Sequence, residues 1–239
     1  MINIAIDFGN SSIKVGLFEG SKLLQKFVLK NAVGLGLIIS KPHQHIIVAS
    51  VKENSENILQ QSAAAGKKIV LSAETPLPVQ IKYDTPQSLG VDRIAAVCGA
   101  FQLFPNQDCL IIDMGTCINY ELLDQSGNYL GGIISPGMNM RFQAMHTFTA
   151  RLPLTQSAVW PQLVGKSTTA CLQSGTMNGI MEEMKGVVEK LKVEYPALRV
   201  IICGGDASLF ENQWKPSIFA APELVLVGLN RILSHNVEI

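Results

Sequence analysis

The chain has 239 residues, of which 47% are hydrophobic and 16% are charged, and its 19 basic side chains balance 19 acidic ones. This length can bury one large core, or two cores of about a hundred residues each. The balanced charge disfavours nucleic acid and anionic membranes as partners, because both usually require a basic surplus or a basic stripe.

The first part of the chain predicts three strands followed by alternating strands and helices. Hydrophobic alternation at period two indicates antiparallel strands joined by tight turns, over residues 2–6, 13–18 and 23–29. Further elements are expected in the order strand, helix, strand, helix, over residues 46–50, 53–65, 68–71 and 92–103.

The second part of the chain repeats this order after turn material at residues 104–108. Three strands are expected over 109–112, 118–123 and 129–135, then a long amphipathic helix over 177–191, a strand over 199–203 and a closing helix over 222–233. The repetition predicts an α/β protein of two similar lobes with mixed β-sheets flanked by helices, at residues 1–104 and 105–239.

Two turns of the same design each follow a buried strand: Asp7-Phe8-Gly9-Asn10-Ser11 and Asp113-Met114-Gly115-Thr116-Cys117. In each, a carboxylate stands at the end of the strand, a glycine allows a sharp turn, and hydroxyl or amide groups follow. Such groups suit polyphosphate and its metal ion. Two carboxylates in one cleft are costly unless a cation or water neutralises them, so the doubling favours a functional role.

The five cysteines occur without a C-x-x-C motif, and most lie among apolar neighbours. We expect them to be reduced and buried rather than paired in disulfides or bound to zinc. No apolar run approaches about eighteen residues, and Asp7 interrupts the first one. These features predict a cytoplasmic protein that does not span a membrane.

Asp92 and Arg93 have two interpretations each. Asp92 begins a predicted helix, where aspartate is a frequent N-cap, and Arg93 could form a surface ion pair. The functional alternative depends on chemistry that the two side chains allow: a carboxylate can act on a hydroxyl, and a guanidinium matches a carboxylate better than an ammonium does.

Taken together, these motifs resemble the type III pantothenate kinases, within the actin, sugar kinase and Hsp70 nucleotide-binding superfamily. The joint order and spacing of the motifs carry the resemblance along nearly the whole chain: Asp7 to Ser11 with Lys14, Tyr83, Gly90-Val91-Asp92-Arg93, Asp113 to Thr116, Tyr129 to Ile133, Ser135-Pro136-Gly137, Ala150 to Pro153, Thr168 and Cys203-Gly204-Gly205. The resemblance implies an actin-like, ribonuclease H-like duplication with nucleotide in the cleft between the lobes.

The resemblance also implies an activity: ATP-dependent phosphorylation of the primary hydroxyl of pantothenate, the first step of coenzyme A biosynthesis. Asp92 would be the catalytic base or hydroxyl-orienting group. The implied pantothenate-binding residues are Tyr83, Gly90, Val91, Asp92, Arg93 and Thr168. The implied ATP-binding residues are Asp7, Phe8, Gly9, Asn10, Ser11, Ser12, Ile13, Lys14, Thr116, Gly204 and Gly205.

Two ions and a dimer complete what the resemblance implies. Mg²⁺ would accompany ATP near Asp7, and a monovalent cation, K⁺ or NH₄⁺, would lie near Asp113. Family members are usually homodimers, and Thr168 would be supplied across the subunit interface. The segment from Met138 to Leu152 is a candidate interface helix, although the same residues would also suit a core.

The chain departs from the family pattern after the second turn. Cys117, Asn119 and Glu121 stand where the family usually has alanine, threonine and aspartate, and Ser11 stands where threonine is common. Two rival functions follow from the same turns: another small-molecule kinase or hydrolase of the superfamily, and a nucleotide-binding regulatory or actin-like protein without metabolite kinase activity. Neither rival explains the Asp92-Arg93 pair.

Overall fold

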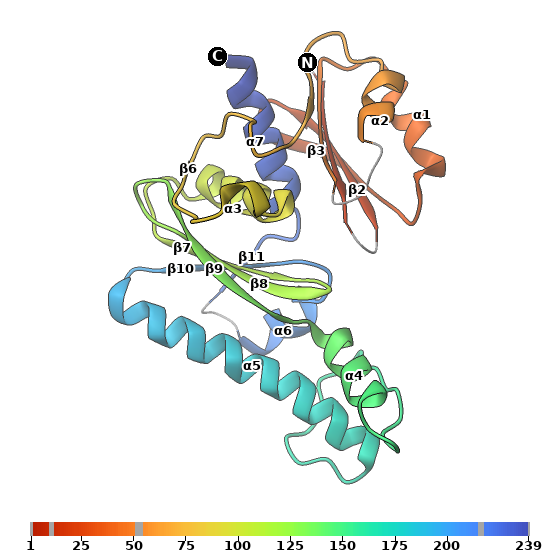
Figure 1. The fold of residues 1–239 in the computed structure, drawn as a ribbon, viewed down its shortest axis with the longest axis vertical. Helices are drawn as coiled ribbons and strands as arrows, with labels where there is room; N and C mark the ends of the chain where they lie inside the picture. Colours follow the sequence, from red (N-terminus) through yellow and green to blue (C-terminus); the bar gives the residue numbers. More distant parts are fainter. Residues whose placement is uncertain (1, 10–11, 51–54, 215–217, 239) are drawn as a thin grey trace. The chain divides into compact units, whose positions relative to one another are not determined.

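In the computed structural model, residues 2–9, 12–50, 55–214 and 218–238 are described, and they form two β-sheets flanked by helices (Figure 1). The predicted α/β class with two mixed sheets is therefore confirmed. By internal contacts the chain divides into two units, Met1–Asn106 with Leu123–Gly131 and Glu223–Ile239, and Gln107–Leu122 with Gly132–Pro222. The lobes at 1–104 and 105–239 stay a prediction.

The first sheet has the strand order β3-β2-β1-β4-β5. Its strands are β1 (Ile2–Phe8), β2 (Ile13–Glu19), β3 (Lys22–Leu29), β4 (His45–Ser50) and β5 (Lys68–Val70). β1, β2 and β3 are antiparallel neighbours, as predicted, whereas β4 runs parallel to β1 and β5 runs parallel to β4. The ends of β1 and β4 therefore lie at the same edge of the sheet, where Phe8 is opposite Ser50.

The second sheet repeats this topology, with the order β11-β10-β7-β8-β9-β6. Its strands are β6 (Gln80–Ile81), β7 (Cys109–Met114), β8 (Cys117–Leu123), β9 (Asn128–Pro136), β10 (Arg199–Cys203) and β11 (Phe219–Ala220). Three consecutive strands are again neighbours, and a later strand, β10, runs parallel to the first of them. The order confirms the predicted duplication.

The helices are α1 (Leu35–Ile39), α2 (Ser55–Gln61), α3 (Val91–Leu103), α4 (Met138–Thr147), α5 (Thr168–Glu194), α6 (Ala207–Trp214) and α7 (Leu224–Glu238), with 3₁₀ turns η1 (Ala32–Gly34) and η2 (Pro86–Ser88). The predicted helix over 53–65 is too long at its end, and residues 53 and 54 lie outside the described residues. The predicted helix over 177–191 is too short, because Ser167 caps α5: its hydroxyl accepts a hydrogen bond from the Ala170 N–H at 3.2 Å.

Two glycines set the packing of α3 against α7 in the first unit. A Cβ on Gly99 would lie 2.3 Å from the carbonyl oxygen of Leu224, and a Cβ on Gly228 would lie 1.7 Å from that of Ala95. The backbones of the two helices are therefore in direct contact, which side chains would prevent. α7 also packs on β1 and β4, so this contact fixes the start of α3 relative to those strands.

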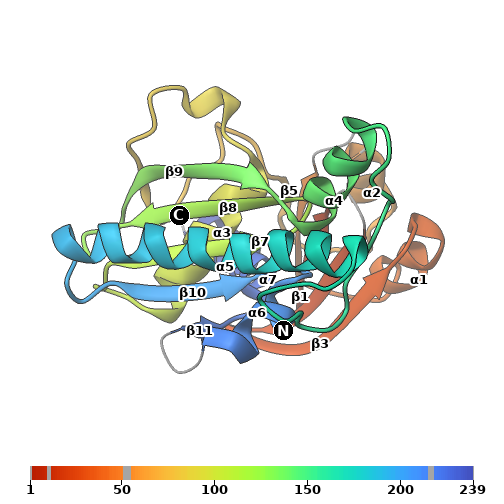
Figure 2. The ribbon, with the colours of Figure 1, turned by 90° about the horizontal axis from the view of Figure 1, so that it is seen from below.

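A second core lies between α5 and the sheet strands of the second unit. Methionines and aliphatic side chains of α5 pack against β7, β8 and β10, and Figure 2 shows α5 in front of these strands and roughly along them. Met138 and Phe142 of α4 are buried in the same core, so the apolar side of α4 serves this core.

The cysteine prediction is wrong at one position. Cys98, Cys109 and Cys203 are buried and Cys117 is half-buried, but Cys171, near the start of α5, is exposed; all five are free thiols.

Among the described residues, no helix is both long enough and apolar enough to cross a membrane.

Candidate functional site

The first Asp-x-Gly turn connects β1 to β2. Asp7 is only 7% exposed, and in the strand register it lies opposite Lys14, whose Nζ is 4.0 Å from Asp7 Oδ2. The N–H of Gly9 donates to the carbonyl of Ser12 at 3.1 Å, which closes the turn directly before Ile13. Asn10 and Ser11, two of the expected ATP-binding residues, lie outside the described residues.

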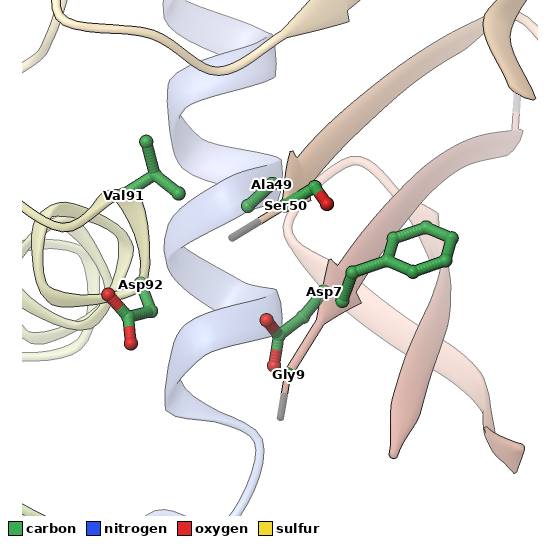
Figure 3. Close-up of a pocket in the computed structure, with 7 residues that line it drawn as sticks. Asp7, Gly9, Ala49, Ser50, Val91 and Asp92 are labelled. Atoms are coloured by element: carbon green, nitrogen blue, oxygen red, sulfur yellow. The ribbon is translucent and has the colours of Figure 1, made fainter. Parts of the chain in front are cut away.

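A small pocket at this edge of the sheet brings together residues from three segments. Two of the segments contain predicted site residues, and the third, at the end of β4, was not predicted to belong to the site. It is lined by Asp7, Phe8 and Gly9 after β1, by Ala49 and Ser50 at the end of β4, and by Val91 and Asp92 at the start of α3. Figure 3 shows Asp7 and Asp92 on opposite sides of this pocket, with the Asp7 carboxylate directed toward α3. A metal-bound phosphoryl group and a hydroxyl acceptor are the kind of ligand that two such carboxylates suit.

Asp92 is not the N-cap of α3, so that interpretation is wrong. Gly90 is the N-cap and Val91 is the first helical residue, while Asp92 Oδ1 accepts a hydrogen bond from the N–H of Arg93 at 2.9 Å. A Cβ on Gly90 would lie 2.6 Å from Asp92 Oδ1, so glycine leaves the space that this carboxylate occupies. The first helical turn also favours a negative charge, through its unpaired N–H groups.

Arg93 is a buried residue held by two tyrosines. Its side chain donates from Nη2 to Tyr129 Oη at 2.9 Å, and its guanidinium carbon is 5.6 Å from the centre of the Tyr83 ring. The two rings stack with centroids 6.0 Å apart and planes 17° apart. At 9% exposure Arg93 is buried, so its interpretation as a surface residue is wrong.

Tyr129 was not predicted as a site residue. Its signal in the sequence is the Tyr129-Leu130-Gly131-Gly132 motif, in which Gly131 has a φ of +120° and passes close to the Tyr83 ring. Tyr129 is fully buried on β9, so its hydroxyl can orient the Arg93 guanidinium without meeting solvent.

The second Asp-x-Gly turn connects β7 to β8 and is closed in a similar way. The N–H of Gly115 donates to the carbonyl of Cys117 at 2.9 Å, and the side chain of Thr116 is exposed. Two glycines approach the turn from other segments. A Cβ on Gly204 would lie 2.5 Å from Asp113 Oδ1, and a Cβ on Gly137 would lie 2.3 Å from the carbonyl oxygen of Gly115.

Asp206 follows the expected Gly204-Gly205 pair and was also missed. Its N–H donates to the carbonyl of Met114 at 3.1 Å, which ties it to the second turn. Burial raises the pKa of its carboxyl above the ordinary value. Gly205 itself is exposed, as a backbone segment that contacts a ligand would be.

Three further positions singled out in the sequence are Thr168, Asn119 and Glu121. Thr168 is the first residue of α5, and its side chain is exposed. On β8, Asn119 is half-buried and Glu121 is fully buried. Among the described residues, no group of three or more His, Cys, Asp or Glu side chains could hold a metal ion.

Comparisons with known proteins agree with the motifs. The sequence model of the type III pantothenate kinase family matches residues 3–190. A type III pantothenate kinase from Cytophaga hutchinsonii is 40% identical over 99% of this chain and 100% of its own length. A type III pantothenate kinase from Phocaeicola vulgatus is 42% identical over 98% of this chain and 99% of its own.

Solved structures with the same fold have little sequence in common with this chain. A conserved putative Baf family transcriptional activator from Campylobacter jejuni aligns with a TM-score of 0.67 at 22% identity, over 99% of this chain and 100% of its own. A putative N-acetylmannosamine kinase from Listeria monocytogenes aligns with a TM-score of 0.56 at 10% identity, over 99% and 100%. At these identities the likeness shows the fold alone.

Proposed function

The chain belongs to the type III pantothenate kinase family, and from this premise we propose that it transfers the γ-phosphate of ATP to pantothenate, the first step of coenzyme A biosynthesis. The observation that carries the proposal is the pocket that both Asp7 and Asp92 line, with the Arg93, Tyr83 and Tyr129 cluster beginning one residue further along α3.

We propose that Asp92 accepts the proton of the pantothenate hydroxyl as the oxygen attacks phosphorus. Phosphoryl transfer depends mainly on positioning and electrostatics, so a carboxylate within hydrogen-bond reach of the acceptor meets the requirement. Gly90 and Val91 place that carboxylate at the pocket, and the Arg93 N–H fixes its orientation.

We assign the pantothenate carboxylate to Arg93. The phenol of Tyr129 and the ring of Tyr83 hold the guanidinium in place, and a guanidinium offers two parallel N–H groups to a carboxylate. Because Arg93 follows Asp92 directly, one short segment would hold both the acid end and the hydroxyl end of the substrate.

The two Asp-x-Gly turns are the proposed ATP site. The first turn would contribute the residues from Asp7 to Lys14, and the second would contribute Thr116, with Gly204 and Gly205 close to the adenosine. Bound Mg²⁺ would neutralise phosphate charge, and Asp7 is the carboxylate in the pocket that fits such an ion.

We place the monovalent cation, K⁺ or NH₄⁺, beside Asp113. Asp113 Oδ1 occupies space that a Cβ on Gly204 would need, so this carboxylate lies beside the backbone of the second turn, and a carboxylate offers oxygen ligands. The measurement is the wild-type rate with K⁺ against the rate with Na⁺ at equal ionic strength, and equal rates would remove this ion from the proposal.

We also propose a cytoplasmic homodimer in which Thr168 completes the partner's pantothenate pocket. The segment after α4 leaves large apolar side chains exposed that a second chain could cover: Phe148 at 85%, Val159 at 77%, Leu163 at 76% and Val164 at 75%. Coverage by a second chain would remove them from water.

The proposed activity is tested with purified protein, ATP, Mg²⁺ and pantothenate, by coupling ADP release to NADH oxidation. ADP release that requires pantothenate, with 4′-phosphopantothenate identified by mass spectrometry, is the expected result. ADP release with sugars but not with pantothenate would favour the sugar kinase alternative. Nucleotide binding without turnover of any acceptor would favour the regulatory alternative.

A further inference from the structure

One carboxylate of the second unit, that of Glu183 on α5, is bound by side chains from three other elements. Oε1 of Glu183 accepts hydrogen bonds from Tyr120 Oη on β8 and from Ser135 Oγ at the end of β9, both at 2.7 Å. Oε2 accepts from Arg141 Nη2 on α4 at 2.6 Å. The network therefore joins α5, β8, β9 and α4.

Arg141 extends the network to the backbone that leaves β9. Its Nη2 also donates to Ser135 Oγ at 2.9 Å, and its Nε donates to the carbonyl of Pro136 at 2.8 Å. Hydrogen bonds between ionised groups are short and strong, so the guanidinium and the carboxylate together restrain the Ser135-Pro136 segment.

The ionisation of Glu183 agrees with this geometry. Burial by itself raises the pKa of the Glu183 carboxyl, but the hydrogen bonds from Ser135, Arg141 and Tyr120, together with the charge of Arg141, outweigh it and leave the pKa below its ordinary value. The network therefore holds Glu183 as a carboxylate at neutral pH.

The restrained Ser135-Pro136 segment is followed by Gly137, which contacts the second Asp-x-Gly turn. Gly137 follows Pro136, and its N–H donates to the carbonyl of Thr116 at 3.1 Å. The carbonyl of Gly137 accepts from the Arg141 N–H at 3.0 Å, so Gly137 is held from both sides. No side chain would fit at Gly137, and any shift of the segment moves the backbone that contacts Gly115 and Thr116.

We propose that Glu183 is a positioning residue for phosphate binding: through Arg141 and Ser135 it holds Pro136-Gly137 against the Gly115-Thr116 turn and so fixes the Thr116 hydroxyl. The inference rests on the proposed function, in which Thr116 contacts the nucleotide. Glu183 itself does not need to touch any substrate.

The test compares Glu183→Gln with Glu182→Gln, its neighbour on α5. Glu182 is 70% exposed and pairs only locally, with Lys185 at 2.8 Å, so it is a matched control for loss of one charge on this helix. We expect Glu183→Gln to weaken binding of a non-hydrolysable ATP analogue by about tenfold to a hundredfold, measured by calorimetry, because small displacements of positioning groups have effects of this size. KM for pantothenate should stay near the wild-type value, and Glu182→Gln should match wild type in both measurements.

The analogue titration separates this inference from the proposed function. A wild-type protein that binds the analogue but does not phosphorylate pantothenate would refute the function and still allow the affinities to be compared. If Glu183→Gln does not fold, Ser135→Ala removes one donor and keeps the ion pair, and a smaller loss of analogue affinity is expected there. Unchanged analogue affinity in a folded variant, or equal weakening of both substrates, would overturn the positioning role.

Discussion

At the scale of single residues, Asp92 carries the chemical proposal, and its substitution is the most direct test. Asp92→Asn keeps the shape of the side chain and an oxygen for the Arg93 N–H, but it removes the proton acceptor. Turnover should fall by about a hundredfold to ten-thousandfold, the usual contribution of a proton-transfer group. The free energy of unfolding should change little. Wild-type turnover in steady-state kinetics would leave Asp92 with a structural role alone.

Substitution of Arg93 should affect pantothenate binding and ATP binding differently. Arg93→Lys should raise KM for pantothenate by about tenfold or more and change KM for ATP much less, because one ammonium cannot replace a bidentate guanidinium. Tyr129→Phe, which removes the hydroxyl that Arg93 donates to, should act in the same direction with a smaller effect. Initial rates measured against each substrate check this, and equal effects on both KM values would place Arg93 on the phosphates.

At the scale of turns and helices, Gly204 is the position where backbone shape matters most for the second turn. Its φ is +94°, and a Cβ there would lie 2.3 Å from the carbonyl oxygen of Met114. Gly204→Ala should therefore lower the free energy of unfolding by about 1 to 3 kcal/mol. Gly205→Ala is the control for stability, because nothing lies within 4 Å of a Cβ at that position. Equal stability of the two variants in urea denaturation would contradict this account.

The Glu183 network predicts a pH-dependent stability. The pKa of the Glu183 carboxyl in the folded protein is below the ordinary value of 4.5. The ionised carboxylate therefore stabilises the fold above pH 4.5, and this stabilisation is lost as the pH falls through the folded pKa. Glu183→Gln should lower the free energy of unfolding by about 2 kcal/mol near neutral pH, since the hydrogen bonds are to a charged group. In denaturant titrations the difference from wild type should shrink as the pH falls below the ordinary pKa. A difference independent of pH would show that the carboxylate's charge is not involved.

The three opening strands of each half and both Asp-x-Gly turns could be predicted from the sequence, because period-two alternation and turn residues are local signals. The short strands β6 and β11 could not, since two residues show no alternation. The Tyr129 to Arg93 hydrogen bond could not, since it joins residues 36 positions apart on a strand and a helix. The start of α5 at Thr168 was missed because its first turns are small and polar and show no apolar stripe. The N-cap of α3 is Gly90 and not Asp92. The sequence could not show this, because the N-cap position depends on backbone angles that the residue types alone do not determine.

At the scale of the whole molecule, the proposed dimer connects the exposed apolar segment to catalysis. The protein should elute as a particle of twice the 25.9 kDa chain mass in size-exclusion chromatography with light scattering. Burial of Phe148, Val159, Leu163 and Val164 in the contact would supply the driving force, since each is at least 75% exposed in the single chain. Phe148→Ser with Val159→Ser should shift the particle toward the monomer.

The same dimer predicts that two inactive variants can restore activity when mixed. Asp92→Asn removes the proposed base, and Thr168→Val removes a hydroxyl that lies exposed at the first residue of α5. If Thr168 completes the pocket of the partner chain, a mixed dimer contains one pocket with both residues intact, because a two-fold contact forms each pocket twice. Co-refolded or co-expressed mixtures should then recover up to about a quarter of wild-type turnover, since half of the chains enter mixed dimers and half of their pockets are intact. A fully active monomer would refute the shared pocket, and a dimer without recovery in the mixture would confine each pocket to a single chain.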